Sequence, residues 1–121
     1  MNYEPGYKKL NVYQKANELA VEVYKTTRKF PKDELFGLVF QMRRSAVSIT
    51  ANIVEGYGRR TDKDKIHFYY ISRGSLNELE YYIDLSKTLG YIDAKTFELL
   101  NSLRIDVGRL LSGFVKFSEK Y

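Results

Sequence analysis

Apolar positions recur at alternating steps of three and four residues along four stretches of this chain. That spacing places side chains along one side of an α-helix. The four apolar seams are Val12, Ala16, Leu19 and Val23; Val39, Met42, Ala46, Ile49 and Ile53; Tyr69, Ser72, Leu76, Leu79, Ile83 and Ser86; and Leu100, Leu103, Val107, Leu110, Phe114, Phe117 and Tyr121. No stretch alternates with the period of two that is typical of β-strands. The pattern therefore predicts an all-α fold.

Residues that commonly end or begin helices separate these four stretches. Pro31 follows the first, Gly58 the second and Gly90 the third. Thr61 and Asp93 are suited to cap the third and fourth helices. The expected helices span about residues 11–29, 34–57, 62–89 and 94–119. Because the links between them are short, we expect a single domain, residues 1–121, folded as an up-down-up-down antiparallel four-helix bundle.

Small residues recur on the second and third helices and predict close packing between them. We align the two helices as antiparallel neighbours across the hinge of residues 57–60. This alignment sets Ser48 opposite Ser72. It also sets Ser45 opposite Ser75. Small facing residues let two helix axes approach to about 8 Å, so these serines are candidate helix-packing residues.

The same alignment brings basic and acidic residues of the two helices to one level. Arg43 and Arg44 lie level with Glu78 and Glu80, which predicts ion pairs between the helices. An alternative is that Glu55, Glu78 and Glu80 hold a metal ion. Di-iron bundles use Glu-x-x-His motifs for this purpose. The chain has one histidine and no such motif, so we expect no metal and no cofactor.

A second apolar stripe runs beside the core-facing seam on the first two helices. Its residues are Tyr13, Ala20 and Tyr24 on the first helix, and Phe36, Phe40, Val47 and Val54 on the second. A bundle helix needs one core-facing stripe, so a second stripe indicates either burial against another subunit or an unusually wide core.

Composition excludes several classes of protein. The chain has 121 residues, 44% of them hydrophobic, and no cysteine, which excludes disulfides and cysteine-ligated metal sites. Neither a signal peptide nor an apolar run long enough to cross a membrane is present, so we expect a cytoplasmic protein without a membrane partner. The net charge of +5 indicates an anionic partner.

The bundle topology places most of the excess charge at one end of the molecule. At this basic end the first helix begins, the second and third helices join, and the fourth helix ends. It has eight basic residues against four acidic ones, Glu4, Asp62, Asp64 and Glu119. Its basic residues are Lys8, Lys9, Arg59, Arg60, Lys63, Lys65, Lys116 and Lys120. The opposite end has six basic and five acidic residues. The middle of the bundle, which we call the waist, has six of each, with Glu55 assigned to it.

These charges predict a nucleic-acid-binding surface, which we call the basic rim. It consists of Lys8, Lys9, Arg59, Arg60, Lys63 and Lys65. Lysine and arginine side chains bind phosphates, and Tyr57 beside them is available to stack on an exposed base. The pattern does not distinguish RNA from DNA.

Two central motifs closely resemble one bacterial family. They are Arg43–Gly56, which reads RRSAVSITANIVEG and is followed by Gly58 and Arg59, and Gly74–Glu80, which reads GSLNELE. Residues 30–38 and 89–91 also look like segments of that family, so the resemblance covers nearly the whole chain. It is the four-helix-bundle family of the 23S rRNA intervening sequences. Thr50 stands where its members usually have proline.

The resemblance implies properties that the residue pattern does not show. Similar proteins form five-fold, ring-shaped homo-oligomers. A related branch is the accessory protein of diversity-generating retroelements, which binds nucleic acid and a reverse transcriptase. The activity of the intervening-sequence branch is not established. A ring would repeat the basic end of each subunit five times on one rim.

Three functions remain open from the sequence. The first is a non-enzymatic, pentameric scaffold that binds RNA or DNA through the basic rim. The alternative is a protein–protein adaptor for a partner such as a reverse transcriptase. The third is an RNA-cleaving enzyme, because Arg60 and His67 loosely resemble the Arg-x(4–6)-His signature of the HEPN ribonucleases. Such a spacing arises easily by chance, and we therefore expect no enzymatic activity.

Overall fold

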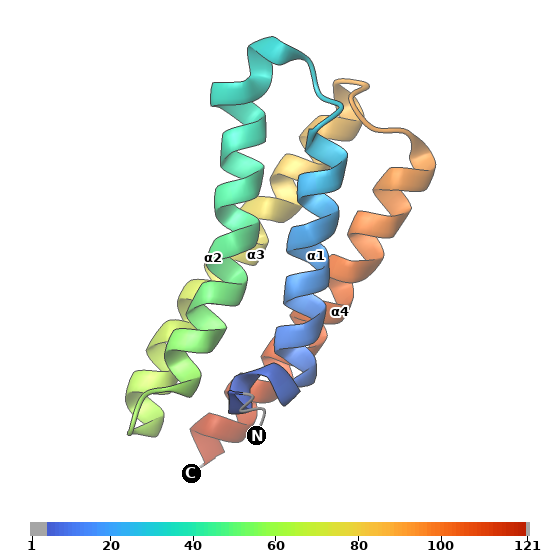
Figure 1. Ribbon diagram of the computed structural model, residues 1–121. Coiled ribbons are helices and arrows are strands. Elements are labelled where there is room, and N and C mark those ends of the chain that lie inside the picture. The colour runs from blue at the N-terminus through green and yellow to red at the C-terminus, as the bar shows by residue number, and fades with distance from the viewer. Residues whose placement is uncertain (1–4, 121) are drawn as a thin grey trace, which may run out of the picture.

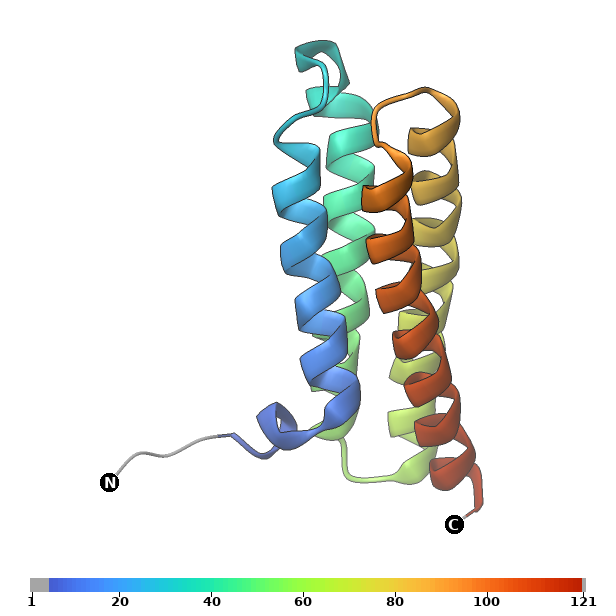
Figure 2. The ribbon, with the colours of Figure 1, turned by 90° about the vertical axis from the view of Figure 1, so that its right-hand side faces the viewer.

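The protein is an up-down-up-down antiparallel four-helix bundle, as the apolar pattern predicts (Figures 1 and 2). The computed structural model describes residues 5–120, without the side chain of Lys120. The helices are α1 (Asn11–Thr27), α2 (Phe40–Tyr57), α3 (Asp62–Thr88) and α4 (Ala94–Lys120), and a short 3₁₀ turn, Gly6–Lys9, precedes α1. Within the described residues there is no strand, and no helix is long and apolar enough to span a bilayer.

The core lies between all four helices and contains the predicted seams of α1, α2 and α3. The last turns of α4 differ from the prediction. Leu111 and Val115 are buried, whereas Phe117 is exposed. Neighbouring helix positions differ by about 100° in direction, and α4 carries apolar residues at adjacent positions, so the pattern did not fix its rotation. Tyr121, the last residue of the predicted seam, lies outside the described residues.

The connection between α1 and α2 is irregular where a regular helix was expected. A 3₁₀ turn, Lys32–Glu34, leads into a π-helical turn, Leu35–Val39, and α2 begins only at Phe40. The Glu34 carboxylate accepts hydrogen bonds from the Tyr91 hydroxyl at 2.8 Å and from the Leu38 N–H at 3.4 Å. The α1–α2 connection is therefore joined to the connection between α3 and α4.

Local interactions set the starts of α3 and α4 and the end of α3 as predicted. Thr61 Oγ1 accepts from the Asp64 N–H at the start of α3, and Asp93 Oδ1 accepts from the Thr96 N–H at the start of α4. Gly90, after the end of α3, has a φ of +78°, which glycine adopts at little cost.

Candidate nucleic-acid interface

The predicted helix-packing serines do lie between α2 and α3, in a shifted register. The Ser75 hydroxyl donates to Ser48 Oγ at 2.8 Å, and the Ser72 hydroxyl donates to the Ile49 carbonyl at 2.8 Å. Ser48 therefore faces Ser75, whereas the alignment paired it with Ser72. The Ser45 hydroxyl donates within its own helix, to a carbonyl one turn earlier. The register differs because the two helices do not meet at the level assumed across the hinge.

The predicted ion pairs between α2 and α3 are wrong. Arg43 turns towards α1, where its Nε donates to Thr27 Oγ1 at 3.0 Å and its guanidinium lies 4.7 Å from the centre of the Tyr24 ring. Glu80 instead pairs with Arg104 of α4 at 3.0 Å. Arg43 thus contacts α1 and Glu80 contacts α4, because the two side chains lie on helix faces that point away from each other.

Arg44 and Glu78 share a small polar cavity without forming an ion pair. The cavity holds about 60 Å³ and is lined also by Gln41, Ser45, Ser48 and Ser75. No ion pair joins Arg44 to Glu78 among the described residues. Glu55, the third glutamate considered as a metal ligand, pairs with Arg59. No group of three or more potential His, Asp or Glu metal ligands occurs in residues 5–120.

The basic rim lies at one end of the bundle, together with both ends of the described chain (Figures 1 and 2). Lys8 and Lys9 belong to the turn before α1, Arg59 and Arg60 to the hinge, and Lys63 and Lys65 to the first turn of α3. Lys65 is half-buried, and the other five are exposed.

One charge at this end was assigned wrongly. Glu55 lies in the last turn of α2, and its carboxylate pairs with Arg59 in the hinge at 3.1 Å. It therefore belongs to the basic end and not to the waist. Among the side chains that the structure describes at this end, seven basic residues then stand against four acidic ones, so the end is still basic. Glu4 and the Lys120 side chain lie outside the described part.

Tyr57 is part of this surface and partly open to solvent. Its side chain is 39% exposed, and the Lys65 ammonium lies 5.7 Å from the centre of its ring. Its hydroxyl lies against Gly6, where an added Cβ would come within 2.8 Å of the oxygen. The ring is thus held between the turn before α1 and the start of α3, with one cation beside it.

The pattern missed a second aromatic residue of this surface. Arg59 lies over the Phe68 ring, 4.5 Å from its centre. Phe68 lies more than two helical turns along the chain from the hinge. Because helical spacing relates only residues within one helix, it does not predict that a hinge residue lies over α3. A search for aromatic residues on the first turns of α3 would have identified it.

The two candidate catalytic residues, Arg60 and His67, do not contact each other in the part of the chain that the structure describes. His67 is exposed, and its ring contacts that of Phe68. No hydrogen bond joins His67 to Arg60 among the described residues. The pKa of the nearby Tyr69 is raised to about 12. Burial is the main cause, and the charges of Tyr57 and Asp62 contribute to it. The Tyr69 hydroxyl therefore stays protonated to a higher pH than an ordinary tyrosine does.

The second apolar stripe lies on the surface between α1 and α2. Phe36 is 90% exposed and Phe40 is 52% exposed. They line a groove of about 550 Å³, and Val47 connects it to a second groove of about 270 Å³ that Tyr13 and Val54 line. We call the two together the α1–α2 groove. The stripe is therefore mostly outside the core, although Ala20 is buried.

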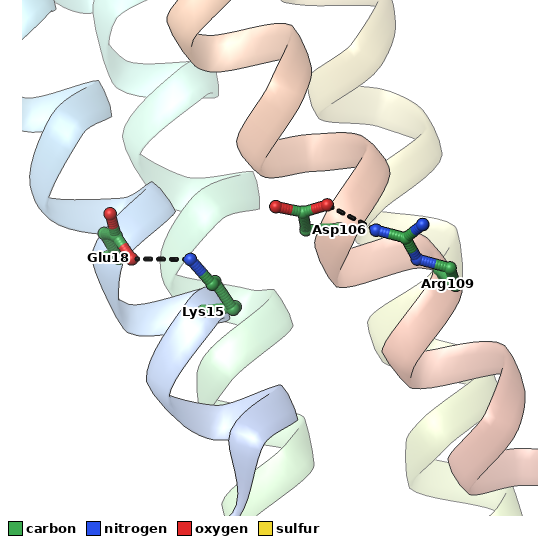
Figure 3. Close-up of polar contacts among 4 residues, drawn as sticks. All are labelled: Lys15, Glu18, Asp106 and Arg109. Carbon is green, nitrogen blue, oxygen red and sulfur yellow. Dashed lines mark hydrogen bonds and ion pairs between the residues drawn. The ribbon is translucent and has the colours of Figure 1, made fainter.

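The neighbouring face between α1 and α4 is polar by contrast. Figure 3 shows Lys15 paired with Glu18 on α1, and Arg109 paired with Asp106 on α4. Each pair is formed within one helix at a spacing of three residues, at 3.5 Å and 2.6 Å. Such exposed pairs suit contact with water. Apolar and polar faces are thus distributed unevenly around the bundle.

Comparison with known proteins agrees with the resemblance of the motifs. Residues 8–113 match the family described as 23S rRNA-intervening sequence protein. A crystal structure of a protein of unknown function from the S23 ribosomal protein family of Bacteroides thetaiotaomicron shares 30% sequence identity and a TM-score of 0.78, covering 87% of this chain and 98% of its own. No curated protein matches the chain. The chain therefore belongs to the 23S rRNA-intervening sequence protein family.

Proposed function

We propose that this protein is a non-enzymatic scaffold that assembles into a homo-oligomer and binds nucleic acid through the basic rim. The observation that carries the proposal is the position of the rim. Three segments distant in the sequence, the turn before α1, the α2–α3 hinge and the first turn of α3, contribute exposed cations to one end of the bundle. Such an arrangement attracts a polyanion without requiring a catalytic group.

Within the rim, the unpaired cations carry most of this argument. Arg60 and Lys63 are exposed and form no ion pair among the described residues, whereas Arg59 already pairs with Glu55. Binding a phosphate therefore costs Arg60 and Lys63 no existing interaction. Their charges are also the ones whose removal should weaken binding without loosening the hinge.

The α1–α2 groove supports the assembly. It exposes large apolar side chains along two helices, and such surfaces commonly mark protein–protein contacts. The ring of five subunits follows from the resemblance of the motifs to ring-forming proteins. A ring would bring five copies of the basic rim together, and several weak sites on one polyanion bind more tightly than one.

The first test combines charge reversal with salt dependence. The variant Arg60→Glu/Lys63→Glu should bind structured RNA at least tenfold more weakly than the unmodified protein, and raising the salt concentration should weaken the unmodified protein further. Fluorescence anisotropy of labelled RNA measures both effects. The matched control is Lys29→Glu/Lys32→Glu, at the opposite end of the bundle. Equal affinities for the two reversed variants would contradict the assignment of the rim.

The α1–α2 groove also favours a second function, that of an adaptor for a protein such as a reverse transcriptase. In that case the groove is covered by the partner, and the isolated protein is a monomer. Light scattering separates the two functions, because the scaffold has the mass of several subunits without any partner.

A further inference from the structure

Aromatic rings and cations are paired twice on the basic end. Arg59 lies over Phe68, and Lys65 lies beside Tyr57. The Arg59 side chain is 45% exposed and Tyr57 is partly exposed as well. Both pairs therefore reach solvent within a surface whose remaining side chains are largely basic.

Cations alone are sufficient to bind a duplex, because its phosphates lie outside and its bases are stacked within. Unpaired bases are different, since they stack on aromatic rings and on the planes of arginine guanidinium groups. Half-exposed rings and an arginine plane among basic side chains thus suit a ligand with exposed bases.

The orientation of Arg59 strengthens this argument. The Glu55 carboxylate pairs with its guanidinium at 3.1 Å, and its Cζ lies over the Phe68 ring, 4.5 Å from the ring centre. A guanidinium held by two such contacts binds a base with a smaller loss of side-chain freedom than a free arginine does. Arg60 and Lys63, which have no such contacts with the residues that the structure describes, remain for the phosphates.

On these grounds, and resting on the nucleic-acid binding proposed above, we propose that the ligand of the basic end is single-stranded nucleic acid. Its unpaired bases stack on Tyr57 and on the guanidinium of Arg59, while Arg60 and Lys63 bind the backbone. Tyr57 and Phe68 then determine the preference for single strands, and the rim charges determine the affinity for any nucleic acid.

A third pair, Arg73 beside Tyr70, is excluded from this site. The Arg73 guanidinium donates to Ser112 of α4, and the Tyr70 hydroxyl donates to Glu119. These contacts join α3 to α4, so a base stacked there would compete with bonds that hold the two helices together. The stacking site therefore ends before Tyr70.

The test compares two labelled probes with equal numbers of phosphates, a single strand of about 12 nucleotides and a short hairpin duplex. We expect the unmodified protein to bind the single strand more tightly. The variant Tyr57→Leu/Phe68→Leu should lose about tenfold in affinity for the single strand and keep its affinity for the duplex. The variant Arg60→Gln/Lys63→Gln should bind both probes more weakly.

Tyr81→Leu is the matched control, because Tyr81 is an exposed aromatic residue of α3 away from the rim. It should bind both probes as the unmodified protein does. Should the double variant fail to fold, which circular dichroism detects, Tyr57→Leu alone replaces it, with a smaller loss for the single strand. Equal affinity of the unmodified protein for both probes, or an undiminished preference in the folded variant, would overturn the stacking site and leave the proposed function intact. Absence of binding to either probe at low salt would overturn both.

Discussion

At the scale of single residues, two glycines of similar helical setting have opposite roles. Gly56 is buried in the last turn of α2, and a Cβ there would lie 2.5 Å from Tyr69 Cε1 and 3.1 Å from the Lys65 carbonyl. Gly74 lies on the exposed side of α3, and apart from its chain neighbours and the adjacent helix backbone nothing in the described residues lies within 4 Å of a Cβ added there. At Gly56 the close neighbours leave no room for a larger residue. At Gly74 there is room, so the effect of a substitution depends on the backbone freedom that glycine loses on folding.

The substitution Gly56→Ala should destabilise the protein by about 1–3 kcal/mol, because the Tyr69 ring and the α3 backbone must move to admit the methyl group. Gly74→Ala, the matched control, should stabilise it by about 0.5–1 kcal/mol through the helix preference of alanine. Urea denaturation measures both. A Gly56→Ala protein as stable as the Gly74→Ala protein would show that the contact with Tyr69 is not tight.

At the scale of helices, the hydrogen bond between Asp93 and Thr96 fixes the start of α4. This bond to the backbone N–H lowers the pKa of the Asp93 carboxyl. A lowered pKa means that the carboxylate contributes its full stability above the pKa of the unfolded chain. That contribution is lost as the pH falls through the lower pKa of the folded protein.

We therefore expect Asp93→Ala to lower the melting temperature by a few degrees at neutral pH, with a difference that shrinks towards about pH 2. Asp93→Asn keeps a capping oxygen without a titrating group, so its melting temperature should stay closer to that of the unmodified protein. Thermal unfolding followed by circular dichroism at both pH values measures this. A deficit of Asp93→Ala that is independent of pH would contradict the ionised cap.

The sequence was sufficient to predict helix existence, the caps of α3 and α4 and most core positions, because these depend on spacing within one helix. It did not predict the pairing of Ser48 with Ser75, or the partners of Arg43 and Glu80, since these depend on how neighbouring helices rotate and shift. The π-helical turn before α2 was missed for a similar reason. Glu34, directly before this turn, accepts a hydrogen bond from Tyr91, and the two residues are 57 positions apart.

For the candidate site, topology alone placed the rim cations at one end. Their individual partners were not predictable. The pairing of Arg59 with Glu55 and its position over Phe68 depend on the path of the hinge. Composition and helix order thus locate a charged surface, and only the folded chain shows which of its charges are free.

At the scale of the whole molecule, the faces of the bundle differ in character. The α1–α2 groove is apolar, whereas the face of α1 and α4 carries ion pairs within each helix (Figure 3). Phe36 is the most exposed large apolar side chain in the described part of the chain. It contributes little to the stability of the separate subunit.

If the groove is the contact between subunits, Phe36→Ser should shift the protein towards monomers and raise the dissociation concentration at least tenfold, since buried aromatic anchors dominate such contacts. Sedimentation or light scattering over a range of concentrations measures this. The stability of the monomer should change by less than about 0.5 kcal/mol. Leu99→Ser, an exposed residue of α4, is the control. An unchanged mass for Phe36→Ser would place the contact elsewhere.

Both ends of the described chain lie beside the α2–α3 hinge (Figures 1 and 2). Purification tags or fluorescent proteins fused to either end will therefore sit next to the surface whose binding they are meant to report. The connection after α3, at the far end, is the better position for a probe. Leu89 is exposed there, and because the chain has no cysteine, Leu89→Cys creates a single thiol for attaching a dye.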